Sequence, residues 1–199
     1  RNRVWQILTA DFFSRWIRPA ERVLDLGCGY CQFINNIVCS EKYGMDLNPS
    51  ASDHAAKNVT LLPQDCSARW PFDDNSLDVV FTSNFFEHLP TKSALEITLH
   101  EALRCLKPGG RLIALGPNIR YLHGLYWDFF DHHLALTDQS LVEVLEKTGF
   151  ALEKNIPRFL PYTMVKSPEY PLVFLRLYLR LPMAWRFLGK QFLVVARKP

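Results

Sequence analysis

A short apolar strand that runs straight into a glycine-rich turn constrains the fold of this chain more than any other feature. The strand is expected at residues 22–26, and the turn reads Gly27-Cys28-Gly29. Glycine lets the backbone adopt left-handed conformations and lets a ligand approach the main chain without interference from a Cβ atom. A helix is expected after the turn, through Ile34 and Val38. This order predicts the ligand-binding corner of an α/β sheet.

Strand-like and helix-like segments alternate along most of the chain. Strands that alternate with helices at this spacing predict a parallel sheet with helices on both faces. The helix before the fifth strand is expected to stop at a turn, Lys107-Pro108-Gly109-Gly110. The strands are expected at 22–26, 42–46, 59–62, 77–81, 111–115, within 150–160 and at 191–197, and the main helices at 2–16, 91–106 and 138–148.

Length and charge distribution limit the domain organisation and the partners. The 199 residues are enough for one well-buried domain, so residues 1–199 are expected to form a single domain. Up to residue 156 the chain has 15 Lys and Arg against 19 Asp and Glu, and from residue 157 onward it has 8 against 1. The positive charge is therefore local to the C-terminal part, and no nucleic-acid partner is expected from it.

The cysteines and the N-terminal residues indicate the compartment. Five cysteines are an odd number, which argues against a disulfide framework and for a reducing environment. Cys28 and Cys31 form a C-x-x-C without a second pair, so small loop residues are a better interpretation than a zinc site. The first twenty residues contain no uninterrupted apolar core, and no apolar run is long enough for a membrane span. Together these features predict a cytoplasmic protein.

The residues around the second strand help to distinguish two possible nucleotide ligands, a dinucleotide and S-adenosylmethionine. Asp46 follows Asp25 at the spacing typical of a carboxylate that binds two ribose hydroxyls. A dinucleotide would also need a glycine at position 32, where the chain has Gln32, because the third glycine lets the helix pack close to the strand. S-adenosylmethionine (SAM) has no phosphate and no such requirement. A nicotinamide-dependent oxidoreductase therefore stays a disfavoured alternative.

An ordered set of motifs between about residues 22 and 150 resembles the class I SAM-dependent methyltransferases, with a domain of the type 11 kind. The resemblance implies a Rossmann-like three-layer α/β/α sandwich with a seven-stranded, mostly parallel sheet and an antiparallel last strand. It also implies transfer of a methyl group from SAM to an oxygen, nitrogen or carbon nucleophile. The segments that carry it are 23–29, 43–49, 64–66, 70–81, 87–89 and 106–112.

The resemblance assigns a first group of residues to the methionine part of SAM. Asp25, Gly27 and Gly29 would line it, while Ser83 and Asn84 would offer backbone carbonyls to its ammonium group.

A second group is assigned to the nucleoside part of SAM. Asp46 would bind the ribose, Leu47 would pack on the adenine, Asp65 would accept from the adenine amino group, and the N–H of Cys66 would lie nearby. Asp46 and Asp65 could instead be ordinary turn carboxylates. One departure concerns Cys31, which stands where family members often have a third glycine, so the loop is expected to be slightly tighter.

The segment after the fifth strand is the candidate acceptor side. Residues 117–136 are expected to form a lid over the carboxyl ends of the strands, where ligands bind in open α/β sheets. Its aromatic side chains, at 121, 126, 127, 129 and 130, could wall an apolar pocket. His132 or His133 is the expected general base for a hydroxyl acceptor, with His88 in reserve. The alternative is a packed lid whose polar residues cap helices.

No bound metal is expected from the sequence. Glu87-His88 resembles the end of a Glu-x-x-Glu-His run that holds a divalent ion in some quinone-pathway O-methyltransferases. Here Asn84 replaces the first glutamate and removes an anionic oxygen ligand. Adjacent histidines such as His132 and His133 do not share a helix face, which disfavours a metal cluster within the lid.

Residues 168–190 are expected to form a helical insertion of two helices joined near Pro182. Arg176 and Arg180 lie one helical turn apart among leucines. Peripheral membrane contact, a homodimer surface, a flap over the cleft and simple packing all fit this pattern.

The expected acceptor is a small molecule, a glycan or a lipid-linked compound. The base-flipping motif Asn/Asp-Pro-Pro-Tyr does not follow the fourth strand, where the chain reads Ser83-Asn84-Phe85-Phe86. The alternative from another functional class is a non-catalytic binding or assembly protein with the SAM fold.

Overall fold

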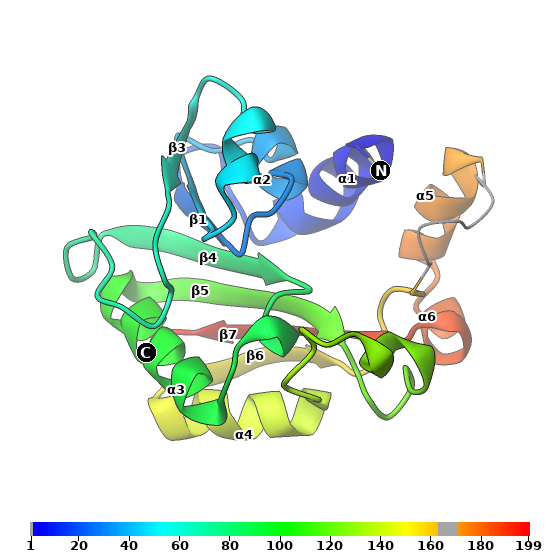
Figure 1. The fold of residues 1–199 in the computed structure, drawn as a ribbon. Coiled ribbons are helices and arrows are strands. Elements are labelled where there is room, and N and C mark those ends of the chain that lie inside the picture. Colours follow the sequence, from blue (N-terminus) through cyan, green and yellow to red (C-terminus); the bar gives the residue numbers. More distant parts are fainter. Residues whose placement is uncertain (1, 163–170) are drawn as a thin grey trace.

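The computed structural model describes residues 2–162 and 171–199, except for the side chain of Leu125. Seven strands form one sheet in the order β3-β2-β1-β4-β5-β7-β6 (Figure 1). β7 is antiparallel to its neighbours β5 and β6, and the other pairs are parallel, which confirms the predicted sheet. The strands are β1 (Arg22–Leu26), β2 (Glu41–Met45), β3 (Val59–Leu62), β4 (Leu77–Ser83), β5 (Leu106–Pro117), β6 (Ala151–Ile156) and β7 (Gln191–Arg197).

Helices cover both faces of the sheet, as Figure 1 shows. α3 (Lys92–Cys105) and α4 (Asp138–Thr148) lie on one face. α1 (Asn2–Ile7), the helical turns that follow it and α2 (Gln32–Asn36) lie on the other, with α5 (Leu172–Arg180) and α6 (Pro182–Leu188) beyond them. Short 3-10 helices are η3 (Pro49–Asp53), η4 (Phe86–His88) and η5 (Leu125–Asp128).

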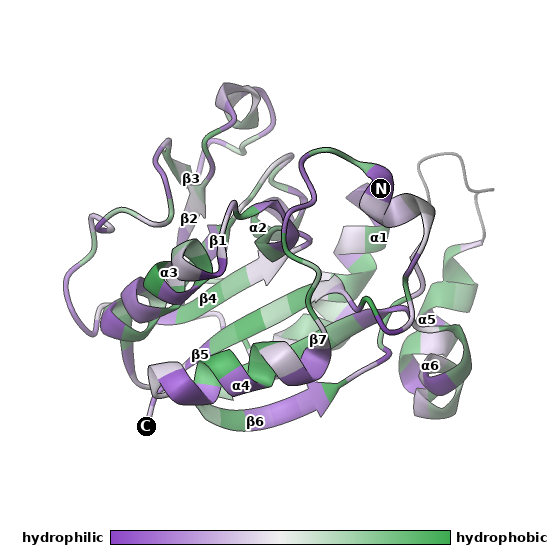
Figure 2. Cartoon of the chain, turned by 60° about the horizontal axis from the view of Figure 1, so that its bottom comes forward, coloured by the Kyte–Doolittle hydropathy of each residue, from purple (hydrophilic) through white to green (hydrophobic). Residues whose placement is uncertain are grey.

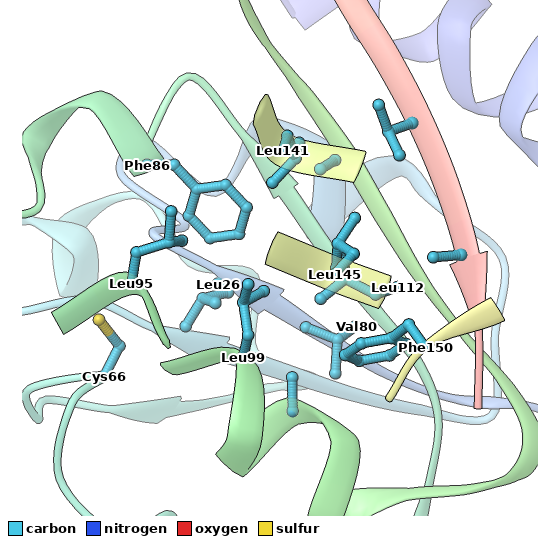
Figure 3. Packing of buried hydrophobic residues seen from close by; sticks show 14 of the residues in the cluster. Leu26, Cys66, Val80, Phe86, Leu95, Leu99, Leu112, Leu141, Leu145 and Phe150 are labelled. Carbon is cyan, nitrogen blue, oxygen red and sulfur yellow. The ribbon is translucent and has the colours of Figure 1, made fainter. Parts of the chain in front are cut away.

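The alternation of side chains along the strands divides the core into two clusters. Figure 3 shows the cluster under α3 and α4, where Leu99 and Leu145 of the helices meet Val80 of β4. The residues next to Val80 on the same strand, Val79 and Phe81, belong to the opposite cluster under α1 and α2. Successive side chains of a strand point to opposite faces, so one apolar strand fills both layers.

The N-terminal helix differs from its prediction as one regular helix. After α1 the chain forms a π-helical turn, η1 (Leu8–Phe12), and then a 3-10 turn, η2 (Phe13–Arg15). The wider π turn brings two consecutive aromatic residues, Phe12 and Phe13, into the core, each fully buried. Val4 of α1 is exposed.

The predicted turn after α3 lies inside the strand β5 and not before it. α3 ends at Cys105, and residues 107–110 form a bulged turn within the bounds of β5, since Leu106 pairs with Leu77 and Arg111 with Val79. Gly109 has a left-handed φ of 78° there. The N–H of Gly109 donates to the carbonyl oxygen of Lys198 at 2.8 Å. The N–H of Lys198 donates to the carbonyl oxygen of Gly110, also at 2.8 Å. Hydrogen bonds with the end of the chain therefore build this turn into the sheet, which the local sequence does not indicate.

Candidate functional site

The candidate residues lie in loops at one edge of the sheet. β1, β2, β4 and β5 are parallel, so their carboxyl ends meet there. Gly27 follows β1, Asp46 follows β2, Asn84 follows β4 and Asn118 follows β5. The structure thus brings the donor-side and lid residues predicted from the sequence to the same edge.

Two glycines shape the loop after β1 for different reasons. Gly27 and Gly29 have φ angles of 69° and 47°, in the left-handed region that favours glycine. A Cβ atom on Gly27 would lie 2.2 Å from ring carbons of Phe85, so this glycine allows close side-chain packing. A Cβ atom on Gly29 would meet nothing within 4 Å, so Gly29 faces open space where a ligand could approach the backbone.

Cys31 occupies a position that suits glycine. Its φ of 54° is left-handed, which is uncommon for a residue with a Cβ atom. Its Sγ lies 3.8 Å from the Sγ of Cys28, and both thiols are free. Burial raises the pKa of both thiols, which disfavours the thiolate forms that a zinc ion would need. The departure from the family glycine is therefore accommodated by backbone strain, and the loop still forms.

Asp46 connects the loops after β1 and β2. One carboxylate oxygen accepts from the N–H of Gly29 at 2.7 Å, and the other accepts from the N–H of Asn48 at 2.8 Å. Each carboxylate oxygen has a second lone pair, so the half-buried side chain retains acceptor capacity for two hydroxyl donors. Leu47 beside it is 67% exposed, so its side chain is accessible to a planar ring.

Asp25 is a buried support of the same loop. It is 3% exposed and accepts a hydrogen bond from the backbone of Ile34. Burial raises the pKa of Asp25 to about 8, and the charge of Asp46 adds to the increase. A carboxyl group that is largely protonated near neutral pH could donate a hydrogen bond as well as accept one.

The loop after β3 has the form of an Asx turn. Asp65 accepts from the N–H and the hydroxyl of Ser67 at 2.8 and 2.7 Å, and its side chain is exposed. Cys66 is buried, and its carbonyl oxygen accepts from Nε1 of Trp70 at 2.8 Å. The turn geometry fits both alternatives for Asp65, because a turn carboxylate at the sheet edge could also bind adenine.

The loop after β4 is held by a residue that the sequence analysis did not identify. Asn84 has a left-handed φ of 50°, and its side chain donates to the hydroxyl of Ser83 at 3.1 Å. Its Oδ1 accepts from Nε2 of Gln191 at 3.0 Å. Gln191 begins β7, far away in the sequence, and no local pattern points to it.

The predicted lid, residues 117–136, packs onto the same edge. Asn118 anchors its start, because its side chain donates to Asp138 at 2.8 Å and to the carbonyl oxygen of Pro157 at 3.0 Å. Within the lid Tyr126 is buried, whereas Phe129 and Phe130 are 52% and 97% exposed. The aromatic residues of this segment therefore do not form one continuous buried wall.

Glu87 lies beneath the lid and is 2% exposed. The hydroxyl of Tyr126 donates to Oε1 of Glu87 at 2.5 Å. The N–H groups of His133 and Leu134 donate to the backbone oxygen of Glu87 at 2.7 and 3.0 Å. Burial raises the pKa of Glu87 to about 7. The sequence analysis considered Glu87 as part of a pair with His88, but not as a hydrogen-bonding centre for the lid.

The candidate histidines have different environments. Nδ1 of His132 lies 2.6 Å from the carbonyl oxygen of Tyr126, so Nδ1 carries the proton and Nε2 has a free lone pair in the neutral ring. Nδ1 of His88 lies 3.1 Å from the carbonyl oxygen and 3.2 Å from the carboxylate of Asp131. Burial lowers the pKa of His88, and His132 lowers it further. The side chain of His133 is exposed.

Three of these side chains are close enough to hold a metal ion. One ligand atom from each of His88, Asp131 and His132 lies within 4.8 Å of the others. The sequence analysis considered only neighbours along the chain, whereas His88 comes from the loop after β4 and the other two come from the lid. Two imidazoles and a carboxylate suit a divalent transition metal.

No helix among residues 2–162 and 171–199 is both long and apolar enough to cross a lipid bilayer.

Comparisons with known proteins agree with this architecture. Residues 24–114 match the model of a methyltransferase domain. The chain is 29% identical over 145 residues to the ubiquinone/menaquinone biosynthesis C-methyltransferase UbiE of Dinoroseobacter shibae, covering 63% of this chain and 55% of that protein. It is 28% identical over 118 residues to phosphoethanolamine N-methyltransferase 1 of Arabidopsis thaliana, covering 53% of this chain and 23% of that protein. The chain thus spans about half or less of the length of these relatives.

Solved structures share the whole fold. A SAM-dependent methyltransferase from Archaeoglobus fulgidus superposes with a TM-score of 0.70 at 18% identity, over 100% of this chain and 95% of that one. The [4+2]-cyclase SpnF superposes with a TM-score of 0.67 at 20% identity, over 98% of this chain and 80% of that one. Fold, motif order and domain match agree: the chain is similar to class I SAM-dependent methyltransferases, and its residues 24–114 match a methyltransferase domain.

Proposed function

We propose that this chain transfers a methyl group from SAM to a small-molecule, glycan or lipid-linked acceptor. The observation that carries the proposal is the loop pair of Gly29 and Asp46. The glycine faces open space, and the carboxylate beside it keeps acceptor capacity at the carboxyl edge of the sheet. These are the two features that a nucleoside with a flexible amino-acid tail requires.

The donor side is assigned to residues at the ends of β1 to β4. Asp46 would bind the ribose hydroxyls, and the exposed Leu47 would pack against the adenine. Asp65 and the N–H of Cys66 would bind the adenine edge. The methionine part would be lined by Asp25, Gly27 and Gly29, with the backbone carbonyls of Ser83 and Asn84 toward its ammonium group.

The acceptor side is assigned to the lid and the loop after β4. SAM supplies an activated sulfonium methyl group, so much of the rate increase can come from positioning and exclusion of water. His132 is the preferred base for a hydroxyl acceptor, since its Nε2 has a free lone pair. His88 and His133 are the reserves. Glu87 and Tyr126 would hold the lid over the carboxyl edge of the sheet.

Two further assignments belong to this proposal. The five free cysteines fit a reducing compartment, and we place the protein in the cytoplasm. A non-catalytic binding or assembly role is the second candidate, because a fold does not determine a reaction: SpnF shares this fold and is a cyclase. The residues at the donor edge are compatible with both.

Calorimetry followed by a transfer assay tests the proposal. SAM and S-adenosylhomocysteine should bind and raise the melting temperature. A ligand concentration of one hundred times Kd should stabilise the folded state by ~2.7 kcal/mol. NAD serves as the control ligand and should not bind. Labelled methyl groups from SAM should then appear in a panel of hydroxyl, amine and lipid-linked compounds. NAD binding without SAM binding would refute the donor assignment, and SAM binding without transfer to any acceptor class would favour the non-catalytic role.

A further inference from the structure

The two helices between β6 and β7 expose an unusual amount of apolar surface. Seven large side chains of α5, α6 and the link between them have exposures between 46% and 72%. We call them the outer apolar surface. It consists of Val173, Phe174, Leu177, Leu181, Met183, Phe187 and Leu188. Large exposed apolar patches on a folded protein mark interaction sites.

This exposure does not come from loose packing, because the opposite side of the same helices is well anchored. Leu179 and Trp185 are buried in the core cluster under α1. Nε1 of Trp185 donates to the carbonyl oxygen of Tyr178 at 2.8 Å, and the guanidinium of Arg158 donates to the carbonyl oxygen of Gly189 at 2.8 Å. α5 is therefore apolar on the side that faces the protein and again on the side that faces solvent. Most of its ribbon has the hydrophobic colour in Figure 2. A helix that is apolar around most of its circumference normally has a second partner.

The charges on this surface have one sign. Four basic residues alternate with the apolar ones, and residues 171–190 contain no Asp or Glu. Arg176 pairs with Asp11 of η1 at 3.0 Å, while Arg180, Arg186 and Lys190 are exposed. Apolar side chains flanked by cations are typical of helices that lie in the interface of an anionic membrane.

We propose that α5 and α6 dock this protein onto a membrane surface that contains anionic lipids. The apolar side chains would enter the headgroup region, and Arg180, Arg186 and Lys190 would contact lipid phosphates. A homodimer through the same surface is less favourable, because a two-fold interface would place these cations opposite their own copies. Anionic headgroups supply the counter-charge that a second copy lacks.

The docking surface is directly connected to the candidate site. The carbonyl oxygen of Lys190 accepts from the N–H of Asn118 at 3.1 Å, at the start of the lid. Gln191, the next residue, donates to Asn84 at 3.0 Å. A docked protein would thus hold the acceptor edge near the lipid, where a lipid-linked acceptor is presented. This last step rests on the proposed methyl transfer, whereas the docking itself does not.

Co-sedimentation with vesicles, without SAM or acceptor, tests the docking. The protein should bind vesicles of phosphatidylglycerol and phosphatidylcholine and lose most of this binding on vesicles of phosphatidylcholine alone or in high salt. Phe174→Ser combined with Phe187→Ser should lower the partition coefficient at least ~10-fold. Arg180→Gln combined with Arg186→Gln should lower it about fivefold per charge removed. The matched control is Val38→Ser with Ile97→Ser, two exposed apolar residues of other surfaces, which should bind like the parent.

Two additional measurements keep the result decisive. Equal melting temperatures of the variants and the parent would show that the substitutions act on the surface and not on folding. Brominated lipids should quench an indole introduced by Phe187→Trp, and not one introduced by Val38→Trp.

Docking is refuted if all proteins bind both vesicle types equally or not at all. A concentration-dependent dimer that the Phe174/Phe187 double variant abolishes would instead assign the surface to self-association. A labelled lipid-linked compound methylated only on vesicles would confirm the acceptor step separately.

Discussion

The donor edge and the acceptor edge of the candidate site are built by different means. Around Gly27, Gly29 and Asp46 the structure is held by backbone groups, with left-handed glycines and amides that donate to one carboxylate. The lid adds buried side-chain bonds to its backbone bonds, above all the bond from the hydroxyl of Tyr126 to the buried carboxylate of Glu87. The loop around Gly27, Gly29 and Asp46, here called the backbone cradle, tolerates few substitutions because its ligand is always the same. The side chains of the lid can vary with the acceptor. Loops on a rigid scaffold are where specificity usually changes.

The largest effect is expected from the acceptor edge. His132→Ala should lower turnover of a hydroxyl acceptor by ~10^2–10^4-fold, because the loss of a general base is felt in the transition state. SAM affinity should stay nearly unchanged, since His132 belongs to the lid. His133→Ala is the matched control, because its side chain is exposed. Measurements of turnover and of SAM affinity for both variants show which histidine acts as the general base. A loss confined to His133→Ala would transfer the role to His133, and parent-like turnover of both would make the histidines structural.

The next effect concerns the backbone cradle. Gly27→Ala should destabilise the fold by roughly 2–4 kcal/mol, since the new Cβ atom would overlap Phe85 in a left-handed conformation. Gly109→Ala is the control, because Gly109 has a φ of 78° but open space at its Cβ position. It should cost only ~1 kcal/mol, from conformation alone. Chemical denaturation measures both. Equal losses would mean that packing against Phe85 adds nothing.

A third prediction tests whether the cradle binds SAM through a side chain. Asp46→Ala should weaken SAM binding by roughly 1.5–3 kcal/mol, the value of one hydrogen bond to a charged group, observed by calorimetry. Asp53→Ala is a nearby exposed control and should bind normally. Unchanged affinity of Asp46→Ala, in a protein that melts like the parent, would remove the ribose assignment.

The smallest effect is the pH dependence of the lid. The pKa of Glu87, raised to about 7 by burial, lies above its ordinary value of ~4.3, so the folded state holds this proton more tightly. Its contribution to stability is therefore present at low pH and is lost as the pH rises through 7. Glu87→Gln does not titrate and should still accept from Tyr126. The free energy of unfolding of the variant, relative to the parent, should therefore be higher at pH 8.5 than at pH 5, by roughly 2–3 kcal/mol.

Denaturant titrations at both pH values measure this difference. Asp25, whose pKa is raised to about 8, titrates in both proteins and cancels from the comparison. A difference between parent and variant that stays constant with pH would show that Glu87 is ionised throughout the range in the folded protein.

Much of the scaffold was predictable because its signals are local. Apolar runs of strand length, Gly27 with Gly29 and the acid at position 46 fixed the sheet, the turn and the donor edge. Predictions were incomplete where distant segments decide local structure. Residues 107–110 turn as predicted, yet hydrogen bonds with Lys198 build this turn into β5 as a bulge. The N-terminal segment has the pattern of one helix, yet a π-helical turn interrupts it and places both Phe12 and Phe13 in the core.

The sequence by itself determined the fold family, the strand-end loops and their polar residues, because these depend on periodicity and on backbone conformations that few residues can adopt. The tertiary structure alone decided three features: the contact of Gln191 with Asn84, the burial of Glu87 under Tyr126, and the exposure of one apolar side of α5 while the other is packed. Each depends on which segments meet in space. Burial and side-chain pairing are properties of the whole packed molecule, and no local pattern encodes them.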